Sequence, residues 1–390
     1  MNAMAEKAAK NTTVPGDSLT NVRLQEVQVV STRATNKTPM AFTNVGKNQI
    51  KAVNHGQDIP YLLSLTPSVT MTSDAGNGIG YTSLRVRGTD PTRVNVTANG
   101  IPMNDAESAG LYWVNMGDFA SSVQSMQIQR GVGTSTNGAG AFGATLNMQT
   151  ENISQNPYFG IDLSAGSYYS HKETVRFSTG IKNNWGFQGR LSNIGSKGYL
   201  DRASTKLNSY FLQAGYFGEN TVVKLITFNG QEETYHAWNY ASKYEQSLYG
   251  RTYNSCGLMY TDANGNMHYY DDQTDNYHQQ HYQLLWNQLL SKALTMNVAL
   301  HYTKGEGYYE QYKNDYGYDD ETTIVSRISS TSVMQRTTTP TVSVYVVMWI
   351  SWSTKSSRVL PMPALLSTMR TRTRVTSGVR QQVTTNIIIM

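Results

Sequence analysis

Three glycines are the first residues that suggest chemistry: Gly138, Gly140 and Gly143 have the GxGxxG spacing of a dinucleotide-binding loop. Such a loop needs a strand before the glycines and a helix opening after them, so that the pyrophosphate meets free N–H groups. Here residues 144–150 alternate small or polar with apolar residues, which predicts a second strand. The sequence therefore argues against a Rossmann-type site and favours glycines that make tight turns.

Two other groups suggest metal binding. Residues 262–266 have some character of a calcium loop, but the glycine is misplaced and no Glu closes it, so the Asn-Gly pair predicts a hairpin turn. His278, His281 and His301 lack cysteine or carboxylate partners at ligand spacing. No metal site is predicted. Because no nucleophile–base pair or pair of carboxylates stands out either, we expect neither an enzyme nor a cofactor.

The composition indicates an all-β majority. The 390 residues include 26 Tyr and 32 Gly, only 15% are charged, and the single cysteine cannot form an intramolecular disulfide. Many short runs end at Gly or Asn, as strands do. No run approaches the ~18–20 apolar residues of a membrane-spanning helix. A membrane location would therefore require a closed barrel, which satisfies every backbone group in lipid.

Charge is distributed unevenly along the chain. The net charge is +5, yet all 27 acidic residues precede residue 322, so the first 321 residues are net acidic. Residues 322–390 contain eight Lys or Arg, no Asp or Glu, and one glycine, Gly378. These basic residues are scattered rather than clustered, which argues against a nucleic-acid-binding arm. Apolar stretches such as 342–350 would aggregate if exposed, and we interpret 322–390 as an aberrant basic tail.

The N-terminal end begins with a polar segment, residues 1–23, that is predicted to be disordered and lacks the apolar core of a secretory signal. The next run, LQEVQVV at 24–30, is β-competent. A short segment of this kind can add to the edge of another protein's sheet through main-chain hydrogen bonds. Taken alone, the run is better explained as an N-terminal edge strand of the domain that follows, and only the residues after it change that weighting.

The following region predicts a small mixed α/β domain. Residues 48–65 have apolar residues at roughly helical spacing, and strands are expected at 83–87 and 93–97. An Asn-Gly pair in 98–102 predicts a tight turn, because these residues tolerate a positive φ.

From residue 159 onward, runs of about ten residues alternate apolar and polar side chains, as barrel strands do when one face meets lipid and the other the lumen. Short turns at 182–184, 218–220 and 291–292 alternate with long links at 195–205, 230–277 and 305–321. Short turns at one end and long loops at the other are typical of a transmembrane β-barrel, whereas a soluble β-sandwich predicts no such alternation.

Several motifs resemble the plug domain of TonB-dependent outer-membrane receptors, especially the Bacteroidetes type. They are LRVRG at 84–88, NGIPM at 99–103, VQSMQIQRG at 123–131 and the glycine-rich run 138–150, and they occur in the family's order and spacing. Residues 24–30, followed by Ser-Thr-Arg, resemble the TonB box. The resemblance covers about residues 24–150. Asn99 replaces the usual Asp and Val132 the usual Pro, and neither change removes a reactive group.

The resemblance implies a mixed α/β plug domain at 31–151, followed by antiparallel transmembrane β-barrel strands and extracellular loops at 152–321. In the family the plug fills a 22-stranded barrel in the cell outer membrane, and TonB pulls the TonB box to open a path. The expected partners are TonB, outer-membrane lipid and an extracellular small ligand such as a metal chelate, and no nucleic acid. The cargo stays open among siderophore-iron, haem, cobalamin and glycan.

Site residues follow from the same resemblance. The TonB-binding residues are Leu24, Gln25, Glu26, Val27, Gln28, Val29 and Val30. The plug-motif residues are Arg85, Arg87, Gly88, Asn99, Gly100, Arg130, Gly131, Gly138, Gly140 and Gly143. In the family such arginines pair with barrel carboxylates; otherwise they are solvated strand ends. The expected ligand contacts are Thr89, Asp90, Arg93, Tyr112 and Trp113.

Two alternatives bear on activity. A non-transporting surface β-protein, such as an adhesin or a binding module, is the competing class. In addition, residues 152–321 supply about seven strands, which cannot close a 22-stranded barrel. An incomplete barrel is therefore expected, and the chain is interpreted as a truncated receptor.

We predict that the sequence from about residue 337 onward is read out of frame. Translation of the source DNA in the other two frames tests this prediction. One of those frames should continue the alternating strands found upstream, and their absence from both frames would contradict the frameshift.

Overall fold

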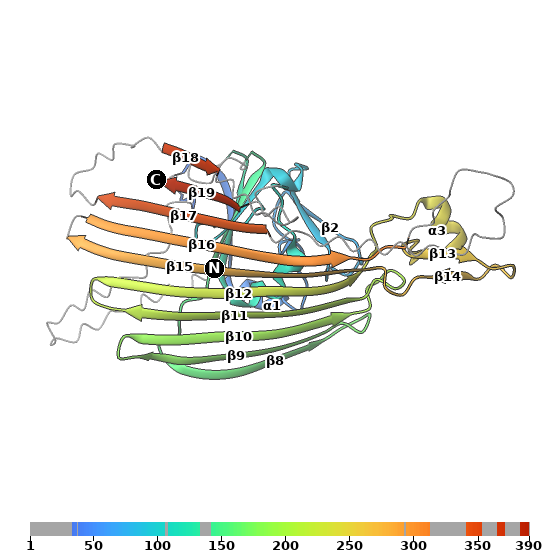
Figure 1. The fold of residues 1–390 in the computed structure, drawn as a ribbon, viewed down its shortest axis with the longest axis horizontal. Coiled ribbons are helices and arrows are strands. Elements are labelled where there is room, and N and C mark those ends of the chain that lie inside the picture. The colour runs from blue at the N-terminus through green and yellow to red at the C-terminus, as the bar shows by residue number, and fades with distance from the viewer. Residues whose placement is uncertain are drawn as a thin grey trace, which may run out of the picture.

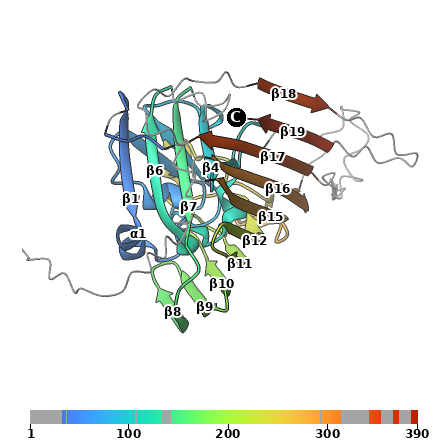
Figure 2. The ribbon, with the colours of Figure 1, turned by 90° about the vertical axis from the view of Figure 1, so that its left-hand side faces the viewer.

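A computed structural model describes residues 33–36, 38–105, 108–132, 142–291 and 294–312, together with the backbone of three strands at 341–352, 365–370 and 383–389. Two parts are evident: an N-terminal mixed α/β domain and a broad sheet of long strands beside it (Figure 1). The sheet curves around one side of the N-terminal domain (Figure 2).

The N-terminal domain is built on a five-stranded sheet with the order β1-β6-β7-β4-β5. Only β4 and β7 pair in parallel; the other neighbours are antiparallel, and β2 and β3 form a separate hairpin. The strands are β1 (Ala41–Gly46), β2 (Val69–Ser73), β3 (Thr82–Val86), β4 (Val94–Ala98), β5 (Ile101–Pro102), β6 (Val123–Arg130) and β7 (Ala144–Thr150). The helical segments are α1 (Lys47–Val53), α2 (Ile59–Leu62) and the 3-10 turns η2 (Pro91–Arg93), η3 (Trp113–Met116) and η4 (Phe119–Ser122).

The helix predicted over 48–65 is two short helices, so that prediction is partly wrong. The first, α1, ends at Val53 and is capped by Asn54, whose backbone N–H donates to the Ile50 carbonyl. The chain then turns at Gly56, whose φ of +114° suits glycine alone among common residues. Pro60 lies in the first turn of α2, where its missing N–H costs nothing. The apolar spacing was read correctly, but the local backbone breaks the helix.

The broad sheet begins as an antiparallel meander, and its order from one edge is β8-β9-β10-β11-β12-β15-β16-β17-β19-β18. Its strands are β8 (Pro157–Ala165), β9 (His171–Lys182), β10 (Trp185–Ser196), β11 (Thr205–Phe217), β12 (Thr221–Tyr235), β15 (Thr274–Ser291), β16 (Leu294–Tyr309), β17 (Thr341–Trp352), β18 (Leu365–Arg370) and β19 (Val383–Ile389). The first seven are the strands expected before residue 322. β17 continues the meander, but β19 pairs with it in parallel, and these strands do not test the reading-frame prediction.

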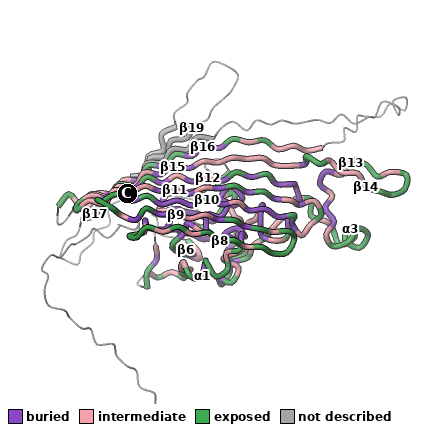
Figure 3. Tube along the Cα trace, turned by 90° about the horizontal axis from the view of Figure 1, so that it is seen from below, coloured by how far each residue is buried: buried purple, intermediate pink, exposed green. Residues whose placement is uncertain are grey.

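The predicted alternation of side chains is present. On β8, Phe159 and Leu163 are 70% and 72% exposed on the outer face, and Ile161 between them is exposed too, while the alternate residues Gly160 and Asp162 are half-buried. Buried and exposed residues also alternate along β9 to β12 (Figure 3). On the outer face of β15 and β16, the rings of Tyr282 and Tyr302 lie 6.0 Å apart. The outward face is thus mainly apolar, while the inward face carries polar residues together with the apolar residues that pack on the N-terminal domain.

The connections also follow the prediction. Asn183 and Asn184 alone join β9 to β10, both with positive φ, while 38 residues separate β12 from β15. That long link carries α3 (Lys243–Tyr249), β13 (Leu258–Thr261) and β14 (Met267–Tyr269), which project beyond one end of the sheet (Figure 1). The Asn-Gly pair between β13 and β14 makes the expected hairpin turn. Among the described residues, no helix combines the length and apolar character needed to cross a membrane.

The two parts share one hydrophobic core. Phe119 of the N-terminal domain packs on Phe211 of β11 and Phe228 of β12, with ring centroids 6.2 and 4.9 Å away. On β12, Gly230 lies directly beneath the backbone of Asn115 in η3, and a Cβ at Gly230 would overlap the Asn115 carbonyl. The sheet can approach the N-terminal domain this closely only because that position has no side chain.

We predict that Gly230→Ala destabilises the seated N-terminal domain by about 1–3 kcal/mol, the usual cost of overpacking. The urea midpoint of the full chain in detergent measures this. Gly160→Ala on β8 is the matched control, because a Cβ there meets no atom within 4 Å. Equal midpoints for the two variants would contradict the close packing.

Candidate functional site

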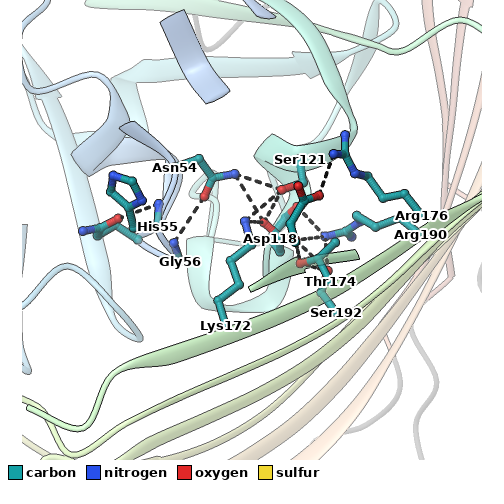
Figure 4. A network of polar contacts seen from close by, with 12 residues as sticks. Asn54, His55, Gly56, Asp118, Ser121, Lys172, Thr174, Arg176, Arg190 and Ser192 are labelled. Atoms are coloured by element: carbon teal, nitrogen blue, oxygen red, sulfur yellow. Dashed lines mark hydrogen bonds and ion pairs between the residues drawn. The ribbon is translucent and has the colours of Figure 1, made fainter. Parts of the chain in front are cut away.

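One carboxylate of the N-terminal domain, Asp118, is enclosed by strands of the curved sheet (Figure 4). It lies between η3 and η4 with a φ of +50°, a left-handed conformation that Asp tolerates better than most residues. Its side chain is fully buried. A buried charge is stable only when it is paired and hydrogen-bonded, so its surroundings decide whether this arrangement can exist.

The sheet supplies the pairing groups from two neighbouring strands. Lys172 and Thr174 are two residues apart on β9, and Arg190 and Ser192 are two apart on β10. Alternate residues of a strand point to the same face, and Thr174 lies opposite Ser192 in the register. All four side chains therefore converge on the inner face, where Asp118 lies.

Both carboxylate oxygens of Asp118 are fully engaged. The Nζ of Lys172 lies 2.6 Å from Oδ1, and the Nη1 of Arg190 lies 2.9 Å from Oδ2. Arg190 also donates to the Asp118 carbonyl oxygen. Further donors are Ser121 and Asn54 to Oδ1, at 2.6 and 3.3 Å, and Ser192 and Thr174 to Oδ2, at 2.6 and 3.0 Å. Asn54 caps α1, so the network also reaches the first helix.

Electrostatics favour the ionised form of Asp118. Burial alone would raise the pKa of this carboxyl, but Arg190 and Lys172 outweigh burial and hold the pKa below its usual range. The carboxylate in turn compensates two buried cations of the sheet. Loss of one partner from such a group leaves an uncompensated buried charge, which is far more costly than loss of a surface ion pair.

At a second polar contact, the sheet presents acidic groups rather than cations to the N-terminal domain. The hydroxyl of Tyr81 donates to Asp275 on β15 and lies 3.4 Å from Oε1 of Glu232 on β12. Burial, then Glu232 and Asp275, raise the pKa of Tyr81, so it remains a donor. Nearby, burial raises the pKa of Asp58 to about 8, although a hydrogen bond from Thr82 opposes the shift. The N-terminal domain thus meets a cationic and an acidic part of the sheet.

Asn99 makes a third contact. Its φ is +56°, as the predicted turn requires, and its Nδ2 donates to Oε1 of Gln283 on β15 at 3.0 Å. Its Oδ1 accepts from the backbone N–H of Thr150. The Asn99 amide thus joins the turn to β15 and to the end of β7.

The three motif arginines lie elsewhere. Arg85 and Arg87 are exposed, and Nη1 of Arg85 lies 3.9 Å from Oδ2 of Asp90 in the same domain. Arg130 donates to Thr43 at 2.7 Å. Within the described residues no ion pair joins these arginines to the curved sheet, so their pairing with barrel carboxylates stays a prediction. The motif glycines Gly88, Gly100 and Gly131 all have positive φ.

The expected ligand contacts fall into two separate groups. Asp90 caps η2 through Thr92, and the turn 89–93 packs against Gly143, whose N–H donates to the Arg93 carbonyl. A Cβ at Gly143 would overlap Thr89.

The second group lies against the sheet. Trp113 is buried in the shared core, so only Tyr112, 53% exposed, is accessible to a ligand. Tyr112 lines a small pocket with His281 and His301 of β15 and β16.

Some predicted residues lie outside the described residues, namely 24–30, Gly138 and Gly140. Conversely, Asp118 and Tyr81 were not predicted. Arg190 falls on the buried, inward face of the alternating strand β10, and an inward arginine requires a counter-charge. That requirement was the available signal, but it does not say which acidic residue supplies the charge. In the described ranges no cluster of three or more His, Cys, Asp or Glu side chains could hold a metal ion.

Comparison with known families accounts for the N-terminal domain. Residues 34–145 match the family model described as the TonB-dependent Receptor Plug Domain. These residues form a plug domain of that family. No curated protein matches the chain in sequence. The plug domain contains Asp118, Tyr81 and Asn99, so its contacts with the curved sheet are plug–barrel contacts.

Solved receptor structures share the fold of plug and barrel strands together. P. aeruginosa FpvA bound to heterologous pyoverdines is 13% identical with a TM-score of 0.52, and the match covers 73% of this chain and 36% of that one. The unliganded ferric citrate transporter FecA is 16% identical with a TM-score of 0.53, and the match covers 70% of this chain and 41% of that one. The siderophore receptor PiuA from Acinetobacter baumannii is 14% identical with a TM-score of 0.52, and the match covers 71% of this chain and 38% of that one. The chain thus spans about two fifths of the receptors it resembles, and the barrel is not closed in the structure.

We predict that Asp118→Asn lowers the free energy of unfolding at pH 7 by about 3–5 kcal/mol, because it leaves Lys172 and Arg190 without a counter-charge. Asn tolerates the left-handed backbone, so the substitution isolates the charge. Since the folded-state pKa is depressed, the stabilisation is present above the unfolded-state pKa and is lost as pH falls through the folded-state value. Urea titrations at several pH values measure it.

The control for this prediction is Asp162→Asn. Asp162 pairs with Arg176 at 2.5 Å but is 40% exposed, so its loss should cost at most about 1 kcal/mol. A cost for Asp118→Asn no larger than this would show that the buried network does not hold the plug.

Proposed function

We propose that this chain acts as a TonB-dependent outer-membrane receptor that imports a scarce nutrient by energy-coupled rearrangement of its plug. The observation that carries the proposal is the seating of a plug-family domain against an antiparallel, outwardly apolar sheet through polar contacts. An outward apolar face and an inward polar face suit a barrel wall between lipid and lumen.

The polar part of the contact between plug and sheet supports movement of the plug. A purely apolar interface would expose hydrophobic surface to water on opening, whereas ionic and hydrogen-bonding groups can be rehydrated. The Asp118 network binds the plug strongly at rest, and Asn54 links it to the helix that follows β1. A pull on the N-terminal segment would reach this network through β1 and α1.

The proposed point of force is the TonB box at residues 24–30. TonB would add as a strand to this segment, so that main-chain hydrogen bonds bear the load and the energy comes from the inner-membrane proton gradient. The cargo candidates are siderophore-bound iron, haem, cobalamin and glycan. Proteins with this fold include a ferric citrate transporter and siderophore receptors, which favours an iron chelate bound on the extracellular side.

We predict that Val27→Pro abolishes binding of the periplasmic domain of TonB to the full chain and abolishes uptake, because proline removes a main-chain donor from the added strand. Binding of an iron chelate should be unchanged. Titration calorimetry measures both binding steps, and labelled-iron uptake measures transport.

The matched control is Thr13→Pro, which places a proline in the polar segment upstream of the box. Normal TonB binding by the Val27→Pro chain would contradict the assignment of the box.

Membrane fractionation with heat-modifiable gel mobility separates the outer-membrane receptor from a soluble binding module, because a folded barrel migrates differently before and after boiling. Recovery of the chain in the soluble fraction alone would favour the module.

A further inference from the structure

A cavity of about 410 Å³ lies between α1 of the plug and the strands β8 and β9. Its size falls in the range of small-molecule sites, ~300–1,000 Å³. Ile50 and Ala120 contribute apolar floor, and both are buried. The cavity adjoins the Asp118 network on the side of Asn54 and His55 (Figure 4). It therefore lies within the plug–barrel interface, beside the network that holds the plug.

The lining of this cavity is predominantly cationic. Lys47 and Lys51 come from α1, and Lys172 and Arg176 come from β9. Only two carboxylates line it, Glu151 and Asp162, so an excess of two positive charges remains with His55 neutral.

The carboxylates of the lining are already engaged. Glu151 pairs with Lys47 at 2.9 Å, and Asp162 pairs with Arg176 at 2.5 Å. Behind the wall of the cavity, Lys172 and Arg190 share Asp118, so these three groups together carry one positive charge, the same as Lys172 counted alone. The excess of two positive charges is therefore preserved when the buried groups are included.

One cationic group, Lys51, faces this space without a described counter-charge, and the ring of His55 lies beside it on the same lining. Lys51 and His55 are both exposed, and neither makes an ion pair among the described residues. A concave, partly apolar site with an unpaired cation attracts and orients anions, because the low-dielectric walls focus the field. Carboxylate and phosphate oxygens are the groups that such a cation binds.

From this geometry we propose that the cavity between α1 and β8–β9 is a binding site for a small, multiply charged anion carrying carboxylate or phosphate oxygens. This use of the site rests on the proposed transport function. There the cavity is an intermediate binding site inside the barrel that favours anionic over neutral cargo. Lys51 provides the unpaired charge, and His55 offers a ring nitrogen for a hydrogen bond. Lys172 and Arg190 share the single negative charge of Asp118 and so add one unit of positive field.

Calorimetric titration of the full chain, folded in detergent micelles at low salt and pH 7, tests the site with citrate as the probe. We expect saturable binding that weakens at least about fivefold in Lys51→Gln, the effect of losing one partly exposed charge contact. Lys51→Arg should retain binding. Raising NaCl to 1 M should weaken citrate binding strongly, because the Debye length falls to about 3 Å. Inorganic phosphate in a parallel titration distinguishes phosphate from carboxylate chemistry.

The matched control is Lys206→Gln, since Lys206 is an exposed lysine of β11 that pairs with Glu233 away from the cavity. Lys51 is exposed, so its substitution should leave folding intact, and heat-modifiable mobility checks this. Absence of saturable binding of both anions, equal loss in Lys206→Gln, or equal binding of glucose would overturn the proposal. Citrate binding without TonB binding would retain the site and reject the transport function, whereas the converse would reject only the site.

Discussion

The structure depends on the compensation of buried charge around Asp118. Two cations of adjacent strands point inward because strand geometry sends alternate residues to one face, and neither could remain there without a counter-charge. The plug supplies that charge from a turn between two short 3-10 segments. The position of the plug against β9 and β10 is thereby fixed by electrostatics, and the hydroxyls around the carboxylate fix its orientation.

The remaining contacts between the plug and the sheet continue from β9 and β10 to β11, β12 and β15. Aromatic packing of Phe119 on β11 and β12 supplies burial, the missing side chain at Gly230 permits close approach, and Tyr81 donates to carboxylates further along. The sheet therefore presents cations at one side of the plug, apolar groups in the middle and acids at the other. Such a graded surface favours one seated orientation, because rotation of the plug would bring like charges together.

Local patterns in the sequence predicted the strands, the faces they present, the short turns and the hairpins, because these depend on alternation and turn chemistry. The helix over 48–65 was misjudged because Gly56 changes the backbone within an otherwise helical apolar pattern. The Asp118 network was beyond sequence reasoning for a different cause. Asp118 lies more than fifty residues from Lys172, and only the fold brings them together. The arginine motifs were recognised by resemblance, but their partners are not among the described contacts.

A double-mutant cycle between Asp118 and Lys172 tests most directly whether buried charge seats the plug. The free energies of unfolding of the full chain, Asp118→Asn, Lys172→Met and the double variant give the coupling energy at pH 7. A coupling of at least about 1.5 kcal/mol is predicted, as for close, desolvated charge pairs. A coupling near zero would contradict the account, because the two groups would then contribute independently.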